Sequence, residues 1–467
     1  MIGSGPNGLS AAILLARAGY AVTVHEAEET IGGGTRSAEL TLPGFLHDVC
    51  SAVHPMAATS PCFEEFPLKQ FGLEWIHPDA PLAHPLDDGT AIMLERSVDE
   101  TCAGLGQDGP AYRKLFGPFV AKVESLFQQS LRPLRLPRNP FLMARFGLRA
   151  IRSARKLVDK WFTGERAKAL FAGLAGHAIL PLEKVLTSAP GLMLGVAAHA
   201  FGWPVAKGGS QKIADGLVAF LRTLGGEIRT GERVVSVDQL PPARSYLFDV
   251  APRNLATICG ERLPERYRRK LNQYRYGPAA FKVDWALDGP IPWKASDCAR
   301  AATVHLGGAF DEIAAGEKAV WEGIHPERPF VLLAQQSLFD PSRAPAGKHT
   351  GWAYCHVPNG SAVDMTERIE AQVERFAPGF RQRILAKSVT TPSKFERNNA
   401  NCIGGDIGGG VMDIWQAFAR PVARFNPYST PAQGIYLCSA STPPGPGVHG
   451  MCGYLAAQTT LRSVLSR

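Results

Sequence analysis

The sequence predicts an α/β protein in which a Rossmann-like domain is combined with a discontinuous α+β domain. A glycine-rich turn, a helix, a strand and an acidic residue follow one another within the first 26 residues. Similar helix and strand patterns recur in 205–251 and 425–467. The first domain is therefore expected to comprise 1–75, 205–251 and 425–467. The segments 76–204 and 252–424 are expected to form the second domain, with a mostly helical part at 110–204.

The first element is the turn that contains Gly3, Gly5 and Gly8, in the spacing G-x-G-x-x-G. The three glycines permit a tight turn, close approach of the backbone to a diphosphate, and close packing of a helix on a strand. Residues 9–18 predict that helix, whose N-terminus directs free N–H groups and a positive dipole end at the diphosphate. Residues 21–25 predict the next strand.

Glu26 closes this strand, about 20 residues beyond the glycines. A carboxylate at this point accepts hydrogen bonds from ribose hydroxyls and repels a 2′-phosphate, which favours FAD or NAD over NADP. A second glycine run, 32–34, precedes Thr35 and Arg36. Because this loop lets backbone approach a diphosphate again and Arg36 can neutralise its charge, the second run favours FAD.

Similarity to a known family is carried by four segments: GSGPNGLSAA at 3–12, IGGGTRS at 31–37, PGFLHDVCSAVHP at 43–55 and GIYLCSASTPPGPGVHGMCGYLAA at 434–457. Weaker similarity lies at 205–221 and 401–410. Through these segments the chain resembles, along essentially its whole length, the flavin oxidoreductases of the phytoene desaturase (carotenoid and retinoid oxidoreductase) family. The resemblance implies an FAD-binding domain of the glutathione-reductase/amine-oxidase type.

The resemblance also implies which residues meet the cofactor. Segment 43–55 is expected beneath the flavin ring, the backbone of Val234 at the adenine, and the turn before the last helix at the pyrimidine end and ribityl chain. The expected FAD-binding residues are Gly3, Gly5, Pro6, Asn7, Gly8, Glu26, Gly33, Gly34, Thr35, Arg36, Val234, Ser441, Gly447, Val448, His449, Gly450 and Met451.

The candidate catalytic residues are His54, His449 and Asp48. The alternative for Asp48 is an ordinary structural role, in which residues 43–44 form a turn and the polar side chains after them cap the next segment. The sequence contains no Ser/His/Asp arrangement of recognisable spacing. This is consistent with a flavin enzyme, in which the cofactor carries the difficult chemistry.

One departure from the family concerns the strand before the first glycine. The family has a full apolar strand there, and here only Met1 and Ile2 precede Gly3. We expect the true start to lie upstream of Met1, and a chain extended upstream to hold FAD more tightly. The alternative is that the fold tolerates a short first strand.

Composition excludes several other classes of protein. The 467 residues, 45% hydrophobic and 20% charged, suit a globular enzyme of two or three domains. No apolar run is long enough to span a membrane and no basic leader is present, so a cytoplasmic location is expected. The nine cysteines lack C-x-x-C spacing, which disfavours a dithiol pair and a metal site. The net charge of +8 is spread along the chain, so nucleic-acid binding is not expected.

Segment 131–161 contains nine basic residues and one acid, Asp159, with apolar residues interleaved. A basic and apolar helix is typical of peripheral contact with an anionic membrane, where a hydrophobic substrate would be found. The alternative is a pair of solvated helices that cover the substrate cavity.

The rest of the second domain is expected to contain a mostly antiparallel sheet that forms one wall of a large apolar pocket. Strands are predicted at 73–76, 90–94, 279–285, 330–336 and 351–357, and helices at 110–129 and 363–376. Lys282 is expected to face solvent, and the alternative is a position on the pocket side. The glycine-rich loop 401–410 is expected to form an edge of the active site. The first domain is expected to contribute strands at 227–230, 234–237, 245–249 and 435–440, and helices at 213–224 and 451–465.

Together these features predict an FAD-dependent oxidoreductase that transfers a hydride between flavin and a hydrophobic, carotenoid- or retinoid-like small molecule. Two alternatives remain open. One is a flavin-binding scaffold of low turnover, and the other is an enzyme of the amine-oxidase type. The latter requires an aromatic cage beside the flavin, which the sequence alone does not locate.

Overall fold

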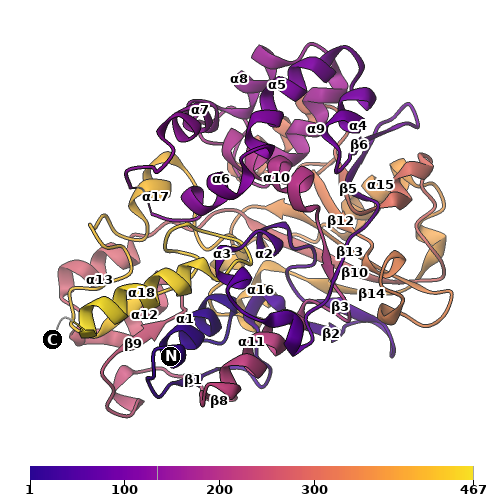
Figure 1. Ribbon diagram of the computed structural model, residues 1–467. Helices are drawn as coiled ribbons and strands as arrows, with labels where there is room; N and C mark the ends of the chain where they lie inside the picture. Colours follow the sequence, from indigo (N-terminus) through magenta and orange to yellow (C-terminus); the bar gives the residue numbers. More distant parts are fainter. Residues whose placement is uncertain (134, 466–467) are drawn as a thin grey trace.

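The computed structural model describes residues 1–133 and 135–465 of the chain. Figure 1 shows three parts that meet near the centre of the molecule: a small parallel sheet with its helices at lower left, a large sheet at right and a layer of helices at the top. Both termini lie at lower left, in the first of these parts.

The small sheet is assembled from strands that are far apart in sequence: β1 (Thr23–His25), β8 (Glu227–Arg229), β9 (Tyr246–Phe248) and β15 (Ile435–Leu437). β1 pairs in parallel with β8, and β9 pairs in parallel with β15. Ile2 forms parallel bridges to both His25 and Phe248 and so joins the two pairs. The residues before the first glycine therefore lie in the middle of this sheet, and the glycine turn follows at its carboxyl edge.

Three helices pack on the small sheet: α1 (Pro6–Arg17), α11 (Gln211–Thr223) and α18 (Met451–Leu465). α1 and α18 lie side by side (Figure 1) and cross at a glycine, since a Cβ on Gly453 would lie only 1.7 Å from the backbone oxygen of Asn7. This close crossing brings the turns before the first and last helices to the same edge of the sheet.

The large sheet has seven strands, in the order β14 (Ile384–Thr390), β10 (Ala279–Leu287), β13 (His349–Val357), β12 (Val331–Ala334), β11 (Ala301–Leu306), β5 (Ala80–Pro85) and β6 (Ala91–Leu94). Only the β11–β5 pair is parallel. The prediction of a mostly antiparallel sheet is confirmed.

The two faces of this sheet have different partners, because alternate residues of a strand point to opposite sides. Phe281, Val283 and Trp285 of β10 pack into one core with α15 (Thr366–Phe376). The residues between them, including Lys282, point to the other face. That face is directed toward the interior of the molecule and forms a wall of the cavity.

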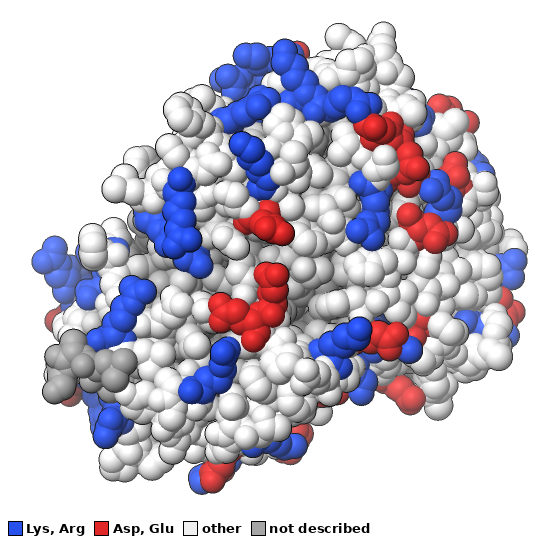
Figure 2. Space-filling model, viewed as in Figure 1, with Lys and Arg blue, Asp and Glu red and all other residues white. Residues whose placement is uncertain are grey.

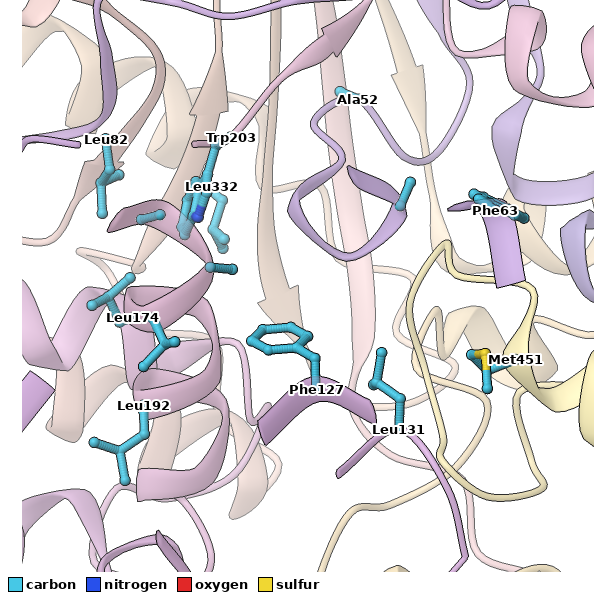
Figure 3. Packing of buried hydrophobic residues seen from close by; sticks show 14 of the residues in the cluster. Ala52, Phe63, Leu82, Phe127, Leu131, Leu174, Leu192, Trp203, Leu332 and Met451 are labelled. Atoms are coloured by element: carbon cyan, nitrogen blue, oxygen red, sulfur yellow. The ribbon is translucent and has the colours of Figure 1, made fainter. Parts of the chain in front are cut away.

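The helical layer contains α4 (Val98–Gly104), α5 (Gly109–Val120), α6 (Val123–Ser130), α7 (Pro140–Ala150), α8 (Ala154–Trp161), α9 (Glu165–Gly176) and α10 (Ser188–Phe201). Gly195 of α10 lets Phe116 of α5 approach, since a Cβ there would lie 2.5 Å from the ring. Phe127 and Leu131 enter the same hydrophobic cluster as Trp203 and Leu332 (Figure 3), which joins this layer to the large sheet.

Short elements connect the three parts: β2 (Ser37–Glu39), β3 (Leu46–Asp48), α2 (Pro55–Ala58), α3 (Pro61–Glu64), β4 (Trp75–Ile76), β7 (Val205–Ala206), α12 (Pro252–Cys259), α13 (Glu265–Asn272), α14 (Phe310–Trp321), α16 (Pro392–Asn398) and α17 (Ile414–Ala419). Within residues 1–133 and 135–465, no helix combines the length and apolar character that crossing a bilayer requires.

Two sequence predictions were wrong. The expected strand at 234–237 is absent from the described structure, because Ser236 and Gln239 form a capping box around the short turn Val237–Gln239. Lys282 does not face solvent, since its side chain is fully buried. The alternation of β10 directs Lys282 to the cavity face, where Asp284 pairs with it.

Candidate active site

A single cavity of about 1070 Å³ lies where the three parts of the molecule meet. Its lining begins at the glycine turn and at Glu26, passes residues 33–36, and extends to the cavity face of the large sheet and to α10. A pocket for one small ligand is typically 300–1,000 Å³, so this cavity is large enough to hold a cofactor together with part of a substrate.

The two glycine loops are in contact at one end of the cavity. Gly3 adopts a left-handed φ of 93° and Gly33 a φ of 53°, which favour glycine. A Cβ on Gly33 would lie 3.3 Å from the Cα of Gly5, and a Cβ on Gly5 would lie 2.8 Å from Oδ2 of Asp249. Side chains at these positions would fill the cradle, which fits the close approach of a diphosphate.

Helix α1 begins at this cradle. Its N-cap is Gly5, which offers no side-chain cap, and its first turn contains no acid. The N-terminus therefore presents its positive dipole end to the cavity. The free backbone N–H groups of this first turn fit an anionic group. Asn7 also lines the cavity, and its Oδ1, an acceptor, is buried without a hydrogen-bond partner among the described residues.

Glu26 holds the glycine loop from the neighbouring strand. One carboxylate oxygen accepts hydrogen bonds from the backbone N–H of Ser4 at 2.9 Å and from its hydroxyl at 2.6 Å. The other accepts the N–H of Glu28 at 3.0 Å. Glu26 and Val234 both line the cavity, at the end where a ribose and a base would follow the diphosphate.

Asp249, which the sequence analysis missed, lies beneath the same turn. Its Oδ2 accepts the N–H of Gly8 at 2.9 Å. Burial raises the pKa of Asp249 to about 7, and the charge of Glu26 adds to the effect. The signal that could have identified it is its position directly after a strand of the parallel sheet, where ligands of such sheets bind.

The C-terminal turn closes the cradle from the other side. Ser441, Gly447, Val448 and His449 line the cavity, as do Gly34, Thr35, Arg36 and Pro6. Gly8, Gly450 and Met451 do not. Gly8 packs against the backbone of Gly3, and a Cβ on Gly450 would lie 2.2 Å from Oγ of Ser10. The structure thus assigns these three positions to packing around the cradle, and not to its surface.

The candidate base Asp48 also lies outside the cavity lining. Its carboxylate is fully buried and receives hydrogen bonds from Ser37, Ser210, Gln336 and Arg343, at 2.7 to 3.0 Å. Burial alone would raise its pKa, but Arg343 and these hydrogen bonds hold the pKa of Asp48 below its usual value. Asp48 is thus placed to neutralise Arg343, and the catalytic assignment made from sequence does not fit this geometry.

The two candidate histidines do line the cavity, and they present opposite hydrogen-bonding groups. The hydroxyl of Ser210 donates to Ser51, so Nε2–H of His54 donates to Ser210 and Nδ1 of His54 is left bare. Nδ1 of His449 accepts the N–H of Met451, so Nε2 carries the proton. Burial lowers the pKa of each histidine to about 4. Both rings are therefore neutral near pH 7.

The large sheet contributes an ion pair and two aromatic rings to the cavity wall. Lys282 pairs with Asp284, and its ammonium lies 5.8 Å from the ring centroid of Trp352. The rings of Trp352 and Tyr354 meet edge to face, with centroids 5.2 Å apart. This aromatic pair was not found from sequence, because it depends on which face of β13 the alternate residues occupy. No cluster of His, Cys, Asp or Glu suited to a metal ion occurs in the described chain.

A glycine cradle at a helix N-terminus, opening into an apolar chamber, defines an FAD-dependent oxidoreductase. Residues 7–253 match the family of flavin containing amine oxidoreductases, and the chain belongs to this family. This match, together with the relatives and solved structures below, confirms three predictions made from the sequence. These are the resemblance to phytoene desaturases, the α/β fold and the FAD cofactor.

Relatives match over nearly the full length of the chain. Pyridine nucleotide-disulfide oxidoreductase domain-containing protein 2 of Rattus norvegicus is 24% identical, with 99% of this chain and 93% of the relative covered. The neurosporene-forming phytoene desaturase of Rhodobacter capsulatus is 25% identical, with 97% and 91% covered.

Two solved structures share the fold. An oxidoreductase from Methanosarcina mazei has a TM-score of 0.67 at 16% identity, with 99% of both chains covered. Putrescine oxidase bound to putrescine has a TM-score of 0.62 at 16% identity, with 100% of this chain and 98% of that chain covered.

Proposed function

We propose that this enzyme transfers a hydride between FAD and a neutral, hydrophobic small molecule. The observation that carries the proposal is the continuity of the cavity, in which the glycine cradle opens directly onto a wall formed by Trp352, Tyr354 and Leu332. A substrate on that wall would share one water-poor chamber with the cofactor. Bound FAD supplies the redox chemistry, by accepting or donating the hydride.

The residues of the chain would bind the cofactor, and they would orient and polarise the substrate. The glycine turn and the start of α1 would hold the diphosphate, and Glu26 the ribose. Nε2–H of His449 and the bare Nδ1 of His54 would offer a donor and an acceptor, because both rings are neutral. Lys282 would supply a fixed positive charge at the chamber wall, since Asp284 holds its ammonium in place.

An amine substrate is the second candidate, favoured by the aromatic pair of Trp352 and Tyr354. Aromatic faces attract cations, and such a pair could enclose an amine. However, the ammonium of Lys282 already lies near the ring of Trp352. A substrate ammonium would compete with Lys282 for the same aromatic face, so the geometry favours a neutral substrate.

The experiment is anaerobic reduction of the FAD-loaded enzyme, followed through the flavin absorption bands. Neutral lipophilic polyenes and alcohols form one panel, and primary and secondary amines the other. We expect reduction by members of the neutral panel. Reduction by amines alone would replace the proposal with amine oxidation, and no reduction by either panel would favour a scaffold.

We further propose that the mouth of this cavity lies against an anionic membrane surface. Phe418 lies in α17 and Phe425 follows this helix. Both residues line the cavity, yet each is more than half exposed to solvent. Phe141 of α7 is 87% exposed and Trp415 of α17 is 77% exposed. α17 lies near α6 and α7 in the view of Figure 1, and Arg132 lines the same cavity.

Charge supports this orientation. Lys and Arg side chains gather over the helices at the top of the molecule in Figure 2. Segment 131–161, which includes α7 and α8, contains nine basic residues and one acid. Exposed aromatic residues together with arginines complement an apolar layer beneath anionic headgroups. A hydrophobic substrate could then pass from the lipid into the cavity without crossing water.

A further inference from the structure

A pair of histidines lies across the large sheet from Lys282. His177, directly after α9, lines the cavity, and its Nε2 lies 3.1 Å from Nε2 of His305 on β11. Lys282, Tyr354, Leu332 and His305 are successive register partners on neighbouring strands. The three strand spacings between Lys282 and His305 amount to about 14 Å. The histidine pair therefore marks the opposite side of the chamber from the Lys282–Asp284 pair.

The pair has one preferred arrangement of protons. Burial lowers the pKa of His177 to about 3 and holds the pKa of His305 well below its usual value, so both rings are neutral. Between two neutral rings, one nitrogen donates and the other accepts. Nδ1 of His305 has no partner among the described residues and faces the backbone of Gly173, where a Cβ would lie 2.6 Å away.

A proton on that nitrogen would be a buried donor without an acceptor, which is unfavourable. His305 therefore carries its proton on Nε2 and donates it to His177. The remaining proton of His177 is then on Nδ1. The side chain of His177 is half-buried, and Nδ1 has no partner among the described residues. His305 thus positions His177 as an N–H donor at the cavity wall.

The surroundings of this donor are mostly apolar. The ring of Trp203 lies 6.0 Å from that of His177, and Leu332 is the register partner of His305. Both residues line the cavity, as do Ile179 and Met193. One further polar group is near: Thr303 lies two residues before His305 on the same face of β11, lines the cavity, and has a buried hydroxyl without a partner in the described structure. A ligand oxygen placed here would find a donor within an apolar pocket.

We propose that His177 donates a hydrogen bond to an oxygen at the end of an elongated apolar substrate. The substrate class is then a neutral lipophilic ketone or alcohol, and not a pure hydrocarbon. This inference rests on the proposed function, because it assumes that the reacting end of the molecule lies toward the FAD cradle and Lys282. It adds a recognition site for the other end.

The test measures the equilibrium binding of two probes to FAD-loaded enzyme. The probes are β-ionone and the hydrocarbon with the same carbon skeleton, and binding is followed by the quenching of tryptophan fluorescence, since Trp203 and Trp352 line the cavity. A single hydrogen bond between neutral groups predicts that the wild-type enzyme binds the ketone up to about tenfold more tightly than the hydrocarbon.

Four variants make the test specific. His177→Phe and His177→Leu are expected to bind both probes equally, and His177→Gln, which keeps an N–H donor, is expected to retain part of the preference. Met193→Leu, a change in the cavity lining that involves no polar group, is expected to leave the preference unchanged. FAD content is measured for each variant as the check on folding.

Two results would overturn the inference: no preference for the ketone in the wild-type enzyme, or an undiminished preference in both His177→Phe and His177→Leu. Failure of the proposed function would look different. In that case the FAD-loaded enzyme would not be reduced by any neutral apolar compound, whatever the binding preference of His177 variants.

Discussion

Lys282 forms an ion pair with Asp284, two residues further along the same strand, and both side chains are fully buried. Burial raises the pKa of Asp284 to about 6, and the ammonium of Lys282 opposes that rise. Nδ1 of His47 lies 3.7 Å from the other side of the Asp284 carboxylate, but burial and Lys282 lower the pKa of His47 to about 3. Lys282 is thus the cationic partner of Asp284.

Replacement of Lys282 by Met is expected to lower the free energy of unfolding by about 3 kcal/mol, because a buried carboxylate loses its partner. Chemical denaturation near neutral pH measures the change. The double variant Lys282→Met with Asp284→Leu removes both charges and is expected to recover most of the loss. Equal stability of the single variant and the wild type would show that the pair is not needed for folding.

Asp48→Asn is expected to be a stability variant and not a catalytic one. It leaves the guanidinium of Arg343, which is fully buried, with one carboxylate partner, Asp340. We expect a loss of about 3 kcal/mol in the free energy of unfolding. The rate of flavin reduction per folded molecule is expected to stay unchanged. A normal stability with a strongly reduced rate would restore Asp48 as a catalytic residue.

Acid is expected to destabilise the fold between pH 6.5 and 4. Among the histidines whose pKa is lowered by burial, six have a pKa of about 3 (His47 and His177) or about 4 (His54, His84, His199 and His449). The unfolded chain binds protons at these residues near pH 6.5 and the folded chain does not, so stability falls as pH falls through this window. Each histidine contributes up to about 1.4 kcal/mol per pH unit.

Three carboxyl groups act in the opposite direction. Burial raises the pKa of Asp249 to about 7, that of Asp284 to about 6, and that of Asp406 above its usual value, so their neutral forms stabilise the fold as pH falls. Six histidines outweigh three carboxyls, and denaturation at about pH 7 and about pH 5.5 is expected to show a net loss. His84→Gln, which keeps a donor for the backbone oxygen of Gly308, is expected to reduce the slope. A flat profile would contradict this prediction.

Removal of the exposed aromatic residues at the cavity mouth is expected to weaken membrane binding. Phe141→Ser and Trp415→Ser are each expected to reduce cosedimentation with vesicles of anionic lipid roughly tenfold, given the apolar area that each ring would bury. Ile324→Ser, at an exposed apolar site after α14, serves as the control. Added salt is expected to weaken binding of the wild type. Unaltered binding, or self-association through the same residues, would contradict a membrane-facing mouth.

The glycine loops could be predicted from sequence because their chemistry is local. The spacing of Gly3, Gly5 and Gly8, and the acid that follows, are fixed by one turn, one helix and one strand. The contact between Gly5 and Gly33 needs only short connections. The same holds for the turn before α18, where the run of glycines was sufficient to indicate a backbone cradle.

The chamber could not be predicted in this way. The cavity positions of Lys282, Trp352 and Tyr354 follow from strand register between segments that are far apart in sequence. That of His177 follows from the contact of the end of α9 with His305 on β11. Alternation along a single strand does not say which face is covered, and α15 decides this for β10 and β13. The ion pair of Asp48 could not be predicted for a related reason, because its partner Arg343 is distant in the chain and becomes adjacent only in the folded protein.

The convergence of the two glycine loops on one FAD is tested most directly by cofactor retention. The purified protein is incubated with FAD, freed of unbound cofactor by gel filtration, and its absorption spectrum is recorded. The wild type and Gly104→Ala, where a Cβ meets nothing within 4 Å, are expected to retain one FAD per chain. Gly5→Val, whose side chain would collide with Asp249 inside the cradle, is expected to elute colourless. A colourless wild type, or full retention by Gly5→Val, would contradict the cofactor site described for this chain.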